Sequence, residues 1–200
     1  MSESTTTRPA FLRPWLIWTA AFLCFPLAGL AGTGVAGRVD DPMAALTGGL
    51  MTGIVIGAGQ SLASSRRLDP RRWIVATAVG MGLGLLLGAT TVGFGTTLTD
   101  LAVMGALTGL LLGAAQAVAL PAPTTHRLAW AAAGPPLWAL GWTLTTLGGI
   151  DVDKQYTVFG AIGAVTVSAL SGALLHRLLP ARPTTARPDN RLAHTSGGTP

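Results

Sequence analysis

Charged side chains are scarce in this chain: 10% of its 200 residues are Asp, Glu, Lys or Arg, whereas a soluble domain carries about 25%. This scarcity argues against an ordinary soluble surface, and the 50% share of hydrophobic residues favours a lipid environment. The 13 basic residues do not form a face interleaved with aromatic side chains, so we expect no nucleic-acid surface.

Groups that ligate metals or catalyse reactions are also few. The single cysteine, Cys24, lies within an apolar run and cannot form an intrachain disulfide. His126, His176 and His194 have no His, Cys or carboxylate partner at ligand spacing, so neither a metal site nor a cofactor is expected. No acid–base pair or nucleophile–base set can be named, so the sequence predicts that the protein is not an enzyme.

Long apolar runs dominate what remains, and each is close to the length needed to cross a ~30 Å hydrocarbon core. They predict an all-α integral membrane protein with six transmembrane helices in residues 15–179. Residues 1–14 and 180–200 are expected to be a polar N-terminus and a disordered tail. The predicted helices lie at about 15–34, 42–64, 73–91, 101–120, 128–147 and 156–179.

The ends and the interior of these helices carry further signals. Asp41 and Asp100 are expected to cap the second and fourth helices, and Pro135 and Pro136 predict a kink in the fifth. The first run could instead be a signal peptide, although it is longer than a 7–15-residue signal core. No charged residue falls in the middle of a run, which disfavours a carboxylate-based proton relay.

Glycines recur at intervals of four in three of the predicted helices and so share one helix face. A glycine ridge of this kind, often called a glycine zipper, lets a second helix approach closely in lipid. The sequence predicts helix packing at Gly49, Gly53, Gly57, Gly80, Gly84, Gly88, Gly105, Gly109 and Gly113.

Two glutamines follow their glycine ridges at the same spacing. Gln60 lies three residues after Gly57, and Gln116 lies three residues after Gly113. Each is therefore expected on or beside the ridge face, where it either forms an interhelical hydrogen bond or lines a substrate path. Tryptophans near the predicted ends of the spans, among them Trp73 and Trp130, are expected in an interfacial aromatic belt.

An internal repeat accompanies these residues. Trp18, Trp73 and Trp130 follow one another at intervals of 55 and 57 residues, and each is followed by Ala and Gly at the same two spacings. The pattern predicts three tandem helical hairpins, although the last hairpin departs from it and carries Ser171 near the position of the glutamines.

These motifs resemble a loose group of small bacterial multi-pass membrane proteins with a repeated G-x-x-x-G-x-x-Q, a basic linker and W-x-x-A. The resemblance covers roughly residues 15–179. It implies an architecture and no activity.

Basic residues are distributed unevenly between the predicted loops. Only Arg38 and Lys154 of the 13 fall on the side opposite the termini. This predicts that both termini face the cytoplasm in a bacterial plasma membrane.

Two functions remain open: a structural or accessory protein, either homo-oligomeric or a subunit of a membrane complex, and a small-solute permease built from repeats. The only partner that the sequence itself requires is the lipid bilayer.

Overall fold

The structure, a computed structural model, describes residues 9–179, and this part of the chain contains helices and no strand. Residues 1–8 and 180–200 lie outside it, together with most of the predicted N-terminal region and the predicted tail. The α-helices are α1 (Pro9–Ala20), α2 (Cys24–Ala36), α3 (Pro42–Ala63), α4 (Pro70–Thr91), α5 (Leu98–Ala119), α6 (Thr124–Leu147) and α7 (Ala161–Leu178). Two 3₁₀ turns, η1 (Ala21–Leu23) and η2 (Val152–Lys154), complete the elements.

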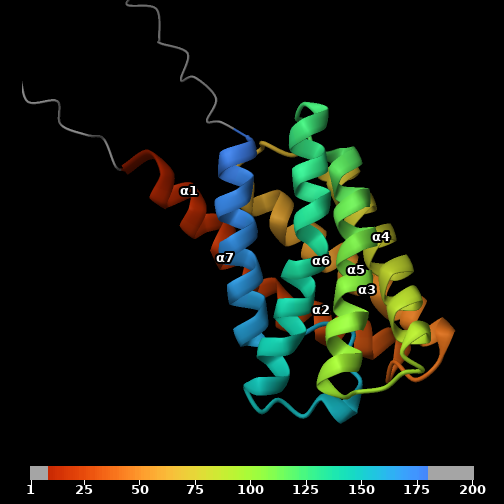
Figure 1. Ribbon diagram of the computed structural model, residues 1–200. Coiled ribbons are helices and arrows are strands. Elements are labelled where there is room, and N and C mark those ends of the chain that lie inside the picture. The colour runs from red at the N-terminus through yellow and green to blue at the C-terminus, as the bar shows by residue number, and fades with distance from the viewer. Residues whose placement is uncertain (1–8, 180–200) are drawn as a thin grey trace, which may run out of the picture.

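Helices that are consecutive in the chain pack against one another from α2 to α7, and α7 also contacts α1 (Figure 1). Since η1 joins α1 to α2, the helices form a closed ring. Both ends of the described chain lie toward one end of this ring, together with loops 64–69 and 120–123 (Figure 1). The loops at the other end span residues 37–41, 92–97 and 148–160.

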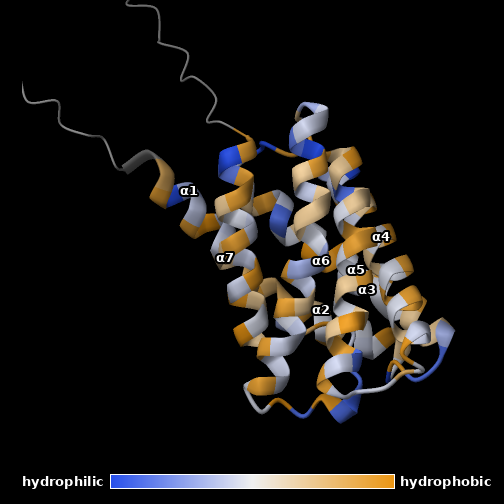
Figure 2. Cartoon of the chain, in the orientation of Figure 1, coloured by the Kyte–Doolittle hydropathy of each residue, from blue (hydrophilic) through white to orange (hydrophobic). Residues whose placement is uncertain are grey.

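Five helical stretches are long and apolar enough to cross a membrane. They cover Phe11–Ala36, Pro42–Ala63, Pro70–Thr91, Leu98–Ala119 and Ala161–Leu178. Hydrophobic residues cover the lengths of the helices, and the most hydrophilic ones gather mainly toward the two ends of the ring (Figure 2). The protein is therefore an all-helical protein compatible with a membrane, and α6 is the long helix outside this set.

The first helical stretch is interrupted, whereas α6 continues through Pro135 and Pro136. The interruption is η1, which lies just before Pro26 of α2. A proline cannot donate a hydrogen bond to the carbonyl four residues earlier, which here belongs to Phe22 within η1. The loss of that bond explains why the helical geometry changes at this turn.

Local capping explains where α3 and α5 begin. The Asp41 carboxylate accepts hydrogen bonds from the backbone N–H groups of Met43 and Ala44 at 2.7 and 2.9 Å, as predicted for a capping residue. The start of α5 differs from the prediction, because Thr97 is the cap and Asp100 closes a capping box from the third helical position. The helix consequently begins at Leu98, about one turn earlier than predicted.

The start of the last helix also differs from the prediction. A helix was expected from residue 156, but α7 begins at Ala161, and the preceding residues run as non-helical chain. Within that chain, Thr157 and Phe159 are buried, and the Thr52 hydroxyl of α3 donates to the Thr157 hydroxyl at 2.8 Å. Irregular backbone is tolerated in membrane proteins where protein surrounds it, and the side chains of Thr157 and Phe159 lie within protein.

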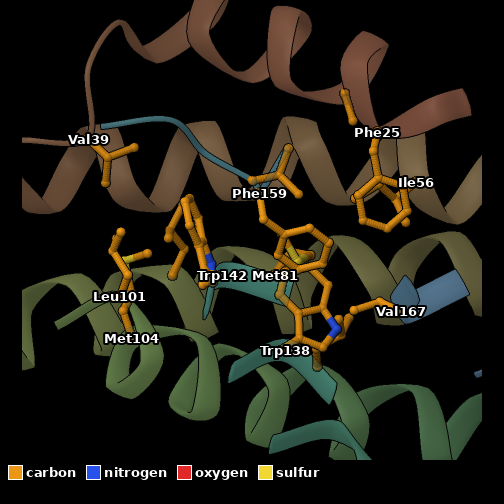
Figure 3. Packing of buried hydrophobic residues seen from close by; sticks show 14 of the residues in the cluster. Phe25, Val39, Ile56, Met81, Leu101, Met104, Trp138, Trp142, Phe159 and Val167 are labelled. Carbon is orange, nitrogen blue, oxygen red and sulfur yellow. The ribbon is translucent and has the colours of Figure 1, made fainter. Parts of the chain in front are cut away.

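Two hydrophobic clusters fill the ring. One, in the half that holds loop 148–160, surrounds Phe159, which stacks on Phe25 and lies edge-on to Trp138 and Trp142 (Figure 3). The second cluster contains three tryptophans, together with Leu68, Leu120 and Leu175. This second cluster adjoins the polar residues described next.

Candidate functional site

Three tryptophans meet inside the ring. Trp18 of α1, Trp73 of α4 and Trp130 of α6 are 1%, 0% and 6% exposed. Their ring centroids are 6.5, 6.5 and 5.8 Å apart, and all three pairs are edge-on, a favourable geometry for aromatic rings. The prediction that Trp73 and Trp130 belong to an interfacial belt is therefore wrong, because both side chains are buried in protein.

Each of these indoles donates its N–H group to a polar side chain on a neighbouring helix. Trp73 Nε1 donates to Gln60 Oε1 at 2.9 Å, which joins α4 to α3. Trp130 Nε1 donates to Gln116 Oε1 at 3.2 Å, which joins α6 to α5. The third bond joins the two ends of the helical ring.

In that third bond, Trp18 Nε1 donates to Ser171 Oγ at 3.2 Å and connects α1 to α7. Trp15 Nε1 adds a bond to the carbonyl of Ala169 at 2.8 Å. The serine thus has the same partner type as the two glutamines, although its shorter side chain offers one oxygen and no amide.

Gln116 is the hub of the polar network. Its Nε2 group donates to Gln60 Oε1 at 3.3 Å and to Thr77 Oγ1 at 3.0 Å, while its Oε1 atom accepts from Trp130. The side chain is 4% exposed. Because α3, α4, α5 and α6 all contribute to these bonds, the two glutamines identified from sequence hold four helices together.

A cavity of about 30 Å³ adjoins this network. About 10–15 Å³ suffices for one ordered water, so the cavity is large enough for one or two. Gln60 Nε2 and Ser168 Oγ have no hydrogen-bond partner among the described residues and are available to such water. The cavity is lined by Phe25, Gln60, Leu112, Gly113, Gln116, Trp130, Ala133, Gly134, Leu137, Trp138, Val167, Ser168, Ser171 and Leu174.

None of the residues that line this cavity is charged, and the described residues contain no group of three or more His, Cys, Asp or Glu that could hold a metal ion. The arrangement offers amides, hydroxyls and indoles, which form hydrogen bonds but do not transfer protons or attack carbonyls at neutral pH without an activating partner. Its chemistry is therefore that of a neutral polar cluster.

The nine glycines of the predicted ridges lie at helix contacts. A Cβ atom added at any of them would come within 3.0 Å of a backbone atom in the next helix along the chain. The neighbour is α4 for Gly49, Gly53 and Gly57, α5 for Gly80, Gly84 and Gly88, and α6 for Gly105, Gly109 and Gly113.

Some residues of the site were not identified from sequence. Gly134 of α6 lies directly against Gly109, although it belongs to no run of glycines at intervals of four. Ser168 of α7 also lines the cavity, three residues before Ser171, which the repeat had already placed near the position of the glutamines. The spacing of the two serines could have indicated a polar face. The interaction between the first and last helices had no local signal.

Comparison with protein-family models, with curated proteins and with solved structures finds no match to this chain. Its function is therefore inferred from the geometry of its own residues.

Proposed function

We propose that this chain is a non-enzymatic structural or accessory membrane protein, acting as a subunit of a membrane complex or as a homo-oligomer. The single observation that carries the proposal is the use of the interior polar groups. The glutamine oxygens accept indole N–H groups, and the Gln116 amide donates to two further side chains. Groups that are committed to such bonds are not free to bind a passing solute.

The proposed architecture has six membrane crossings, of which α6 is the sixth. This helix has 24 residues and would span about 36 Å at 1.5 Å per residue, more than a ~30 Å hydrocarbon core. Its neighbours in the ring, α5 and α7, are themselves long and apolar enough to cross. A crossing by α6 keeps both ends of the described chain on one side.

We further propose that the ring consists of three repeated hairpins, as in the bacterial group that the sequence resembles. Support comes from the equivalent tryptophans, each of which donates to a polar residue on the helix before it in the ring. Because the donor of the first hairpin reaches the acceptor of the last, the pattern is cyclic. If the helices resembled one another only because all are rich in Gly and Ala, this cyclic pattern of bonds would not be expected.

The location that we propose is the bacterial cytoplasmic membrane, with both termini in the cytoplasm. The support is the distribution of basic residues: within residues 9–179, the loops at the end opposite the ends of the described chain contain only two, Arg38 and Lys154. Short loops rich in arginine are retained on the cytoplasmic side.

Affinity purification from native membranes tests the proposed function. A tag after residue 200 leaves residues 1–200 unchanged, and a mild detergent preserves complexes. We expect a partner subunit, or further copies of this chain, at a fixed ratio. A preparation that contains only monomeric protein, at native expression level and in two detergents, would contradict the proposal.

A small-solute permease is the second candidate, and the observation that favours it is the cavity among Gln60, Gln116, Ser168 and Ser171. Transport would use the Nε2 group of Gln60, which is free within the described chain, and would require Gln116 to exchange its present bonds for bonds to a solute. The Gln60→Leu, Gln116→Leu double variant separates the two functions. A double variant that inserts and folds but lacks the cellular phenotype of the wild type would favour the permease.

A further inference from the structure

Side chains from two other elements hold the end of α7. The last carbonyls of a helix have no partner within the helix, and here two groups from outside reach them. His126 Nδ1 of α6 lies 2.9 Å from the carbonyl oxygen of Leu178. Arg67, in the loop between α3 and α4, places Nη1 2.8 Å from His176 Nδ1 and 3.4 Å from the carbonyl oxygen of Leu179. The end of α7 is therefore attached both to α6 and to this loop.

The partners of the two histidines determine where each imidazole carries its hydrogen. A carbonyl oxygen only accepts, so His126 Nδ1 bears a hydrogen and donates it to Leu178. A guanidinium only donates, so His176 Nδ1 is the bare acceptor of the Arg67 N–H group. His176 is consequently the neutral Nε2–H tautomer, whereas the bond of His126 is compatible with a neutral and with a charged ring.

A proton therefore affects the two attachments differently. In protonated His176 both ring nitrogens are donors, so the bond from Arg67 is lost and two adjacent cations repel each other. In protonated His126 the bond to the Leu178 carbonyl persists and becomes charge-assisted, at the C-terminal end of a helix where a cation is favourable. Protonation thus breaks the attachment of α7 to the loop and spares its attachment to α6.

No carboxylate in the described chain compensates a charge on His176. Neither His176 nor Arg67 forms an ion pair within residues 9–179. Asp69 lies in the same loop as Arg67, but its carboxylate accepts from the backbone N–H group of Arg72 at 2.9 Å and caps α4. The other ionisable groups on the elements around His176 are those of Arg13 on α1, Arg66 in the loop, His126 and Arg127 on α6, and Arg177 on α7.

A pocket of about 90 Å³ adjoins the contact between Arg67 and His176, and both residues line it. One ordered water needs about 10–15 Å³, so the pocket is large enough for several. Trp18 of α1 lines the same pocket, and its indole donates to Ser171 of the interior cavity. Separation of Arg67 from His176 would therefore widen a pocket whose wall reaches the interior polar network.

The neighbouring helix α1 contributes only an aromatic contact at this level of α7. Phe11 lies edge-on to the His176 ring, with centroids 5.3 Å apart, and is 48% exposed. Figure 1 shows α1 leaning away from the other helices toward its start. No loop joins α1 to α7, because they stand at the two ends of the described chain. The bond from Arg67 is thus the contact at the end of α7 that depends on an unprotonated Nδ1 of His176.

We propose that Arg67 and His176 form a pH-sensitive latch. At neutral pH the latch holds the end of α7 against the loop between α3 and α4. Protonation of His176 releases this end from the loop, while His126 keeps it on α6, and the pocket beside Trp18 widens. The latch acts on the ring of helices itself, so it is independent of whether the protein is a subunit of a complex or a permease.

Distances between spin labels test the release. In a Cys24→Ala background, Leu62→Cys on α3 and Leu170→Cys on α7 place labels at side chains that are 83% and 45% exposed. Leu128→Cys on α6, at a side chain that is 64% exposed, paired with Leu170→Cys, is the control. Between about pH 7.5 and about pH 5, we expect the 62–170 distance to lengthen and the 128–170 distance to stay constant. An unchanged 62–170 distance, or equal lengthening of both, overturns the proposal.

The same substitution at each histidine tests which ring responds. His176→Asn keeps an oxygen that accepts from Arg67 but does not ionise, so the 62–170 distance should no longer depend on pH. His126→Asn keeps an N–H donor for the Leu178 carbonyl, so the response should remain that of the parent. A response that survives in His176→Asn, or one that disappears in His126→Asn, overturns the proposal.

A measurement on the wild type tests the latch even where a variant fails to fold. In protein with ¹⁵N-labelled histidine and arginine, the imidazole of His176 is identified by its magnetic coupling to a guanidinium. At about pH 7.5 we expect its nitrogen shifts to be those of the neutral Nε2–H tautomer, and at about pH 5 those of the imidazolium, with the coupling to arginine lost. An imidazolium or an Nδ1–H tautomer at neutral pH, or a coupling that persists in acid, overturns the proposal.

Discussion

The bond between Trp130 and Gln116 gives the sharpest test of the interior polar network. Gln116→Leu would leave the buried indole N–H group of Trp130 without its acceptor. An orphaned buried donor costs about 1–3 kcal/mol. The two bonds that the Gln116 amide donates would also be lost, at an average of about 0.6 kcal/mol each in membranes. The free energy of unfolding should therefore fall by about 2–4 kcal/mol.

A double-mutant cycle isolates the bond itself. Trp130→Phe removes the donor, together with ring area that contacts Trp18 and Trp73. The packing loss is the same whether Trp130→Phe is introduced into the wild type or into Gln116→Leu, so it cancels in the cycle. The remaining coupling energy reports the N–H···O bond between the two side chains. We expect the Gln116→Leu, Trp130→Phe double variant to be more stable than the sum of the single changes predicts, by about 1–3 kcal/mol.

The assay is equilibrium unfolding in mixed micelles, followed by tryptophan fluorescence and far-UV circular dichroism. Trp142→Phe serves as the control, because the Trp142 indole forms no hydrogen bond among the described residues and contacts Phe159 instead. Its effect should add to that of Gln116→Leu within about 0.5 kcal/mol. If the Trp130 cycle is as additive as the Trp142 control, the indole does not bind Gln116 and the reasoning fails.

Three further measurements address the packing, the topology and the irregular segment. Gly109→Leu should lower the melting temperature clearly, since its added Cβ would collide with backbone of α6, whereas Gly34→Leu should not; equal melting would place the ridge outside the helix contact. A reporter active only in the periplasm should stay silent after Ser196 and become active near Asp151, and the reverse pattern would reject the proposed orientation. Thr157→Val removes a hydroxyl that accepts a bond from α3, so amide hydrogen exchange in residues 155–160 should accelerate; unchanged exchange would show that this bond does not hold the segment.

Local sequence signals predicted most helix positions, and the failures have identifiable causes. The cap at Asp41 involves neighbours two and three residues away, so it could be predicted from sequence. At Asp100 the residue was identified but its role was not, because Thr97 competes for the capping position one turn earlier. Residues 156–160 were predicted to begin an apolar helix, and their non-helical path depends on contacts with α2, α3 and α6 that are remote in the chain.

At the candidate site, too, local features could be predicted from the sequence and long-range contacts could not. Spacing alone placed Gln60 and Gln116 beside their glycine ridges, because helical periodicity is a local property. Which groups they would meet was not predictable, since Trp73 and Trp130 equally fitted the membrane interface. Their burial depends on how the whole ring closes.

By itself, then, the sequence determined helix content, an apolar character compatible with a membrane, and which residues share each helix face, because composition and the 3.6-residue period act over short distances. The tertiary structure alone decided which faces meet, that three tryptophans converge, and that Trp18 reaches Ser171 across a separation of 153 residues. The physical reason is that backbone hydrogen bonding within a helix is satisfied locally, whereas the partners of an indole or an amide side chain are supplied by whichever helix packs against it.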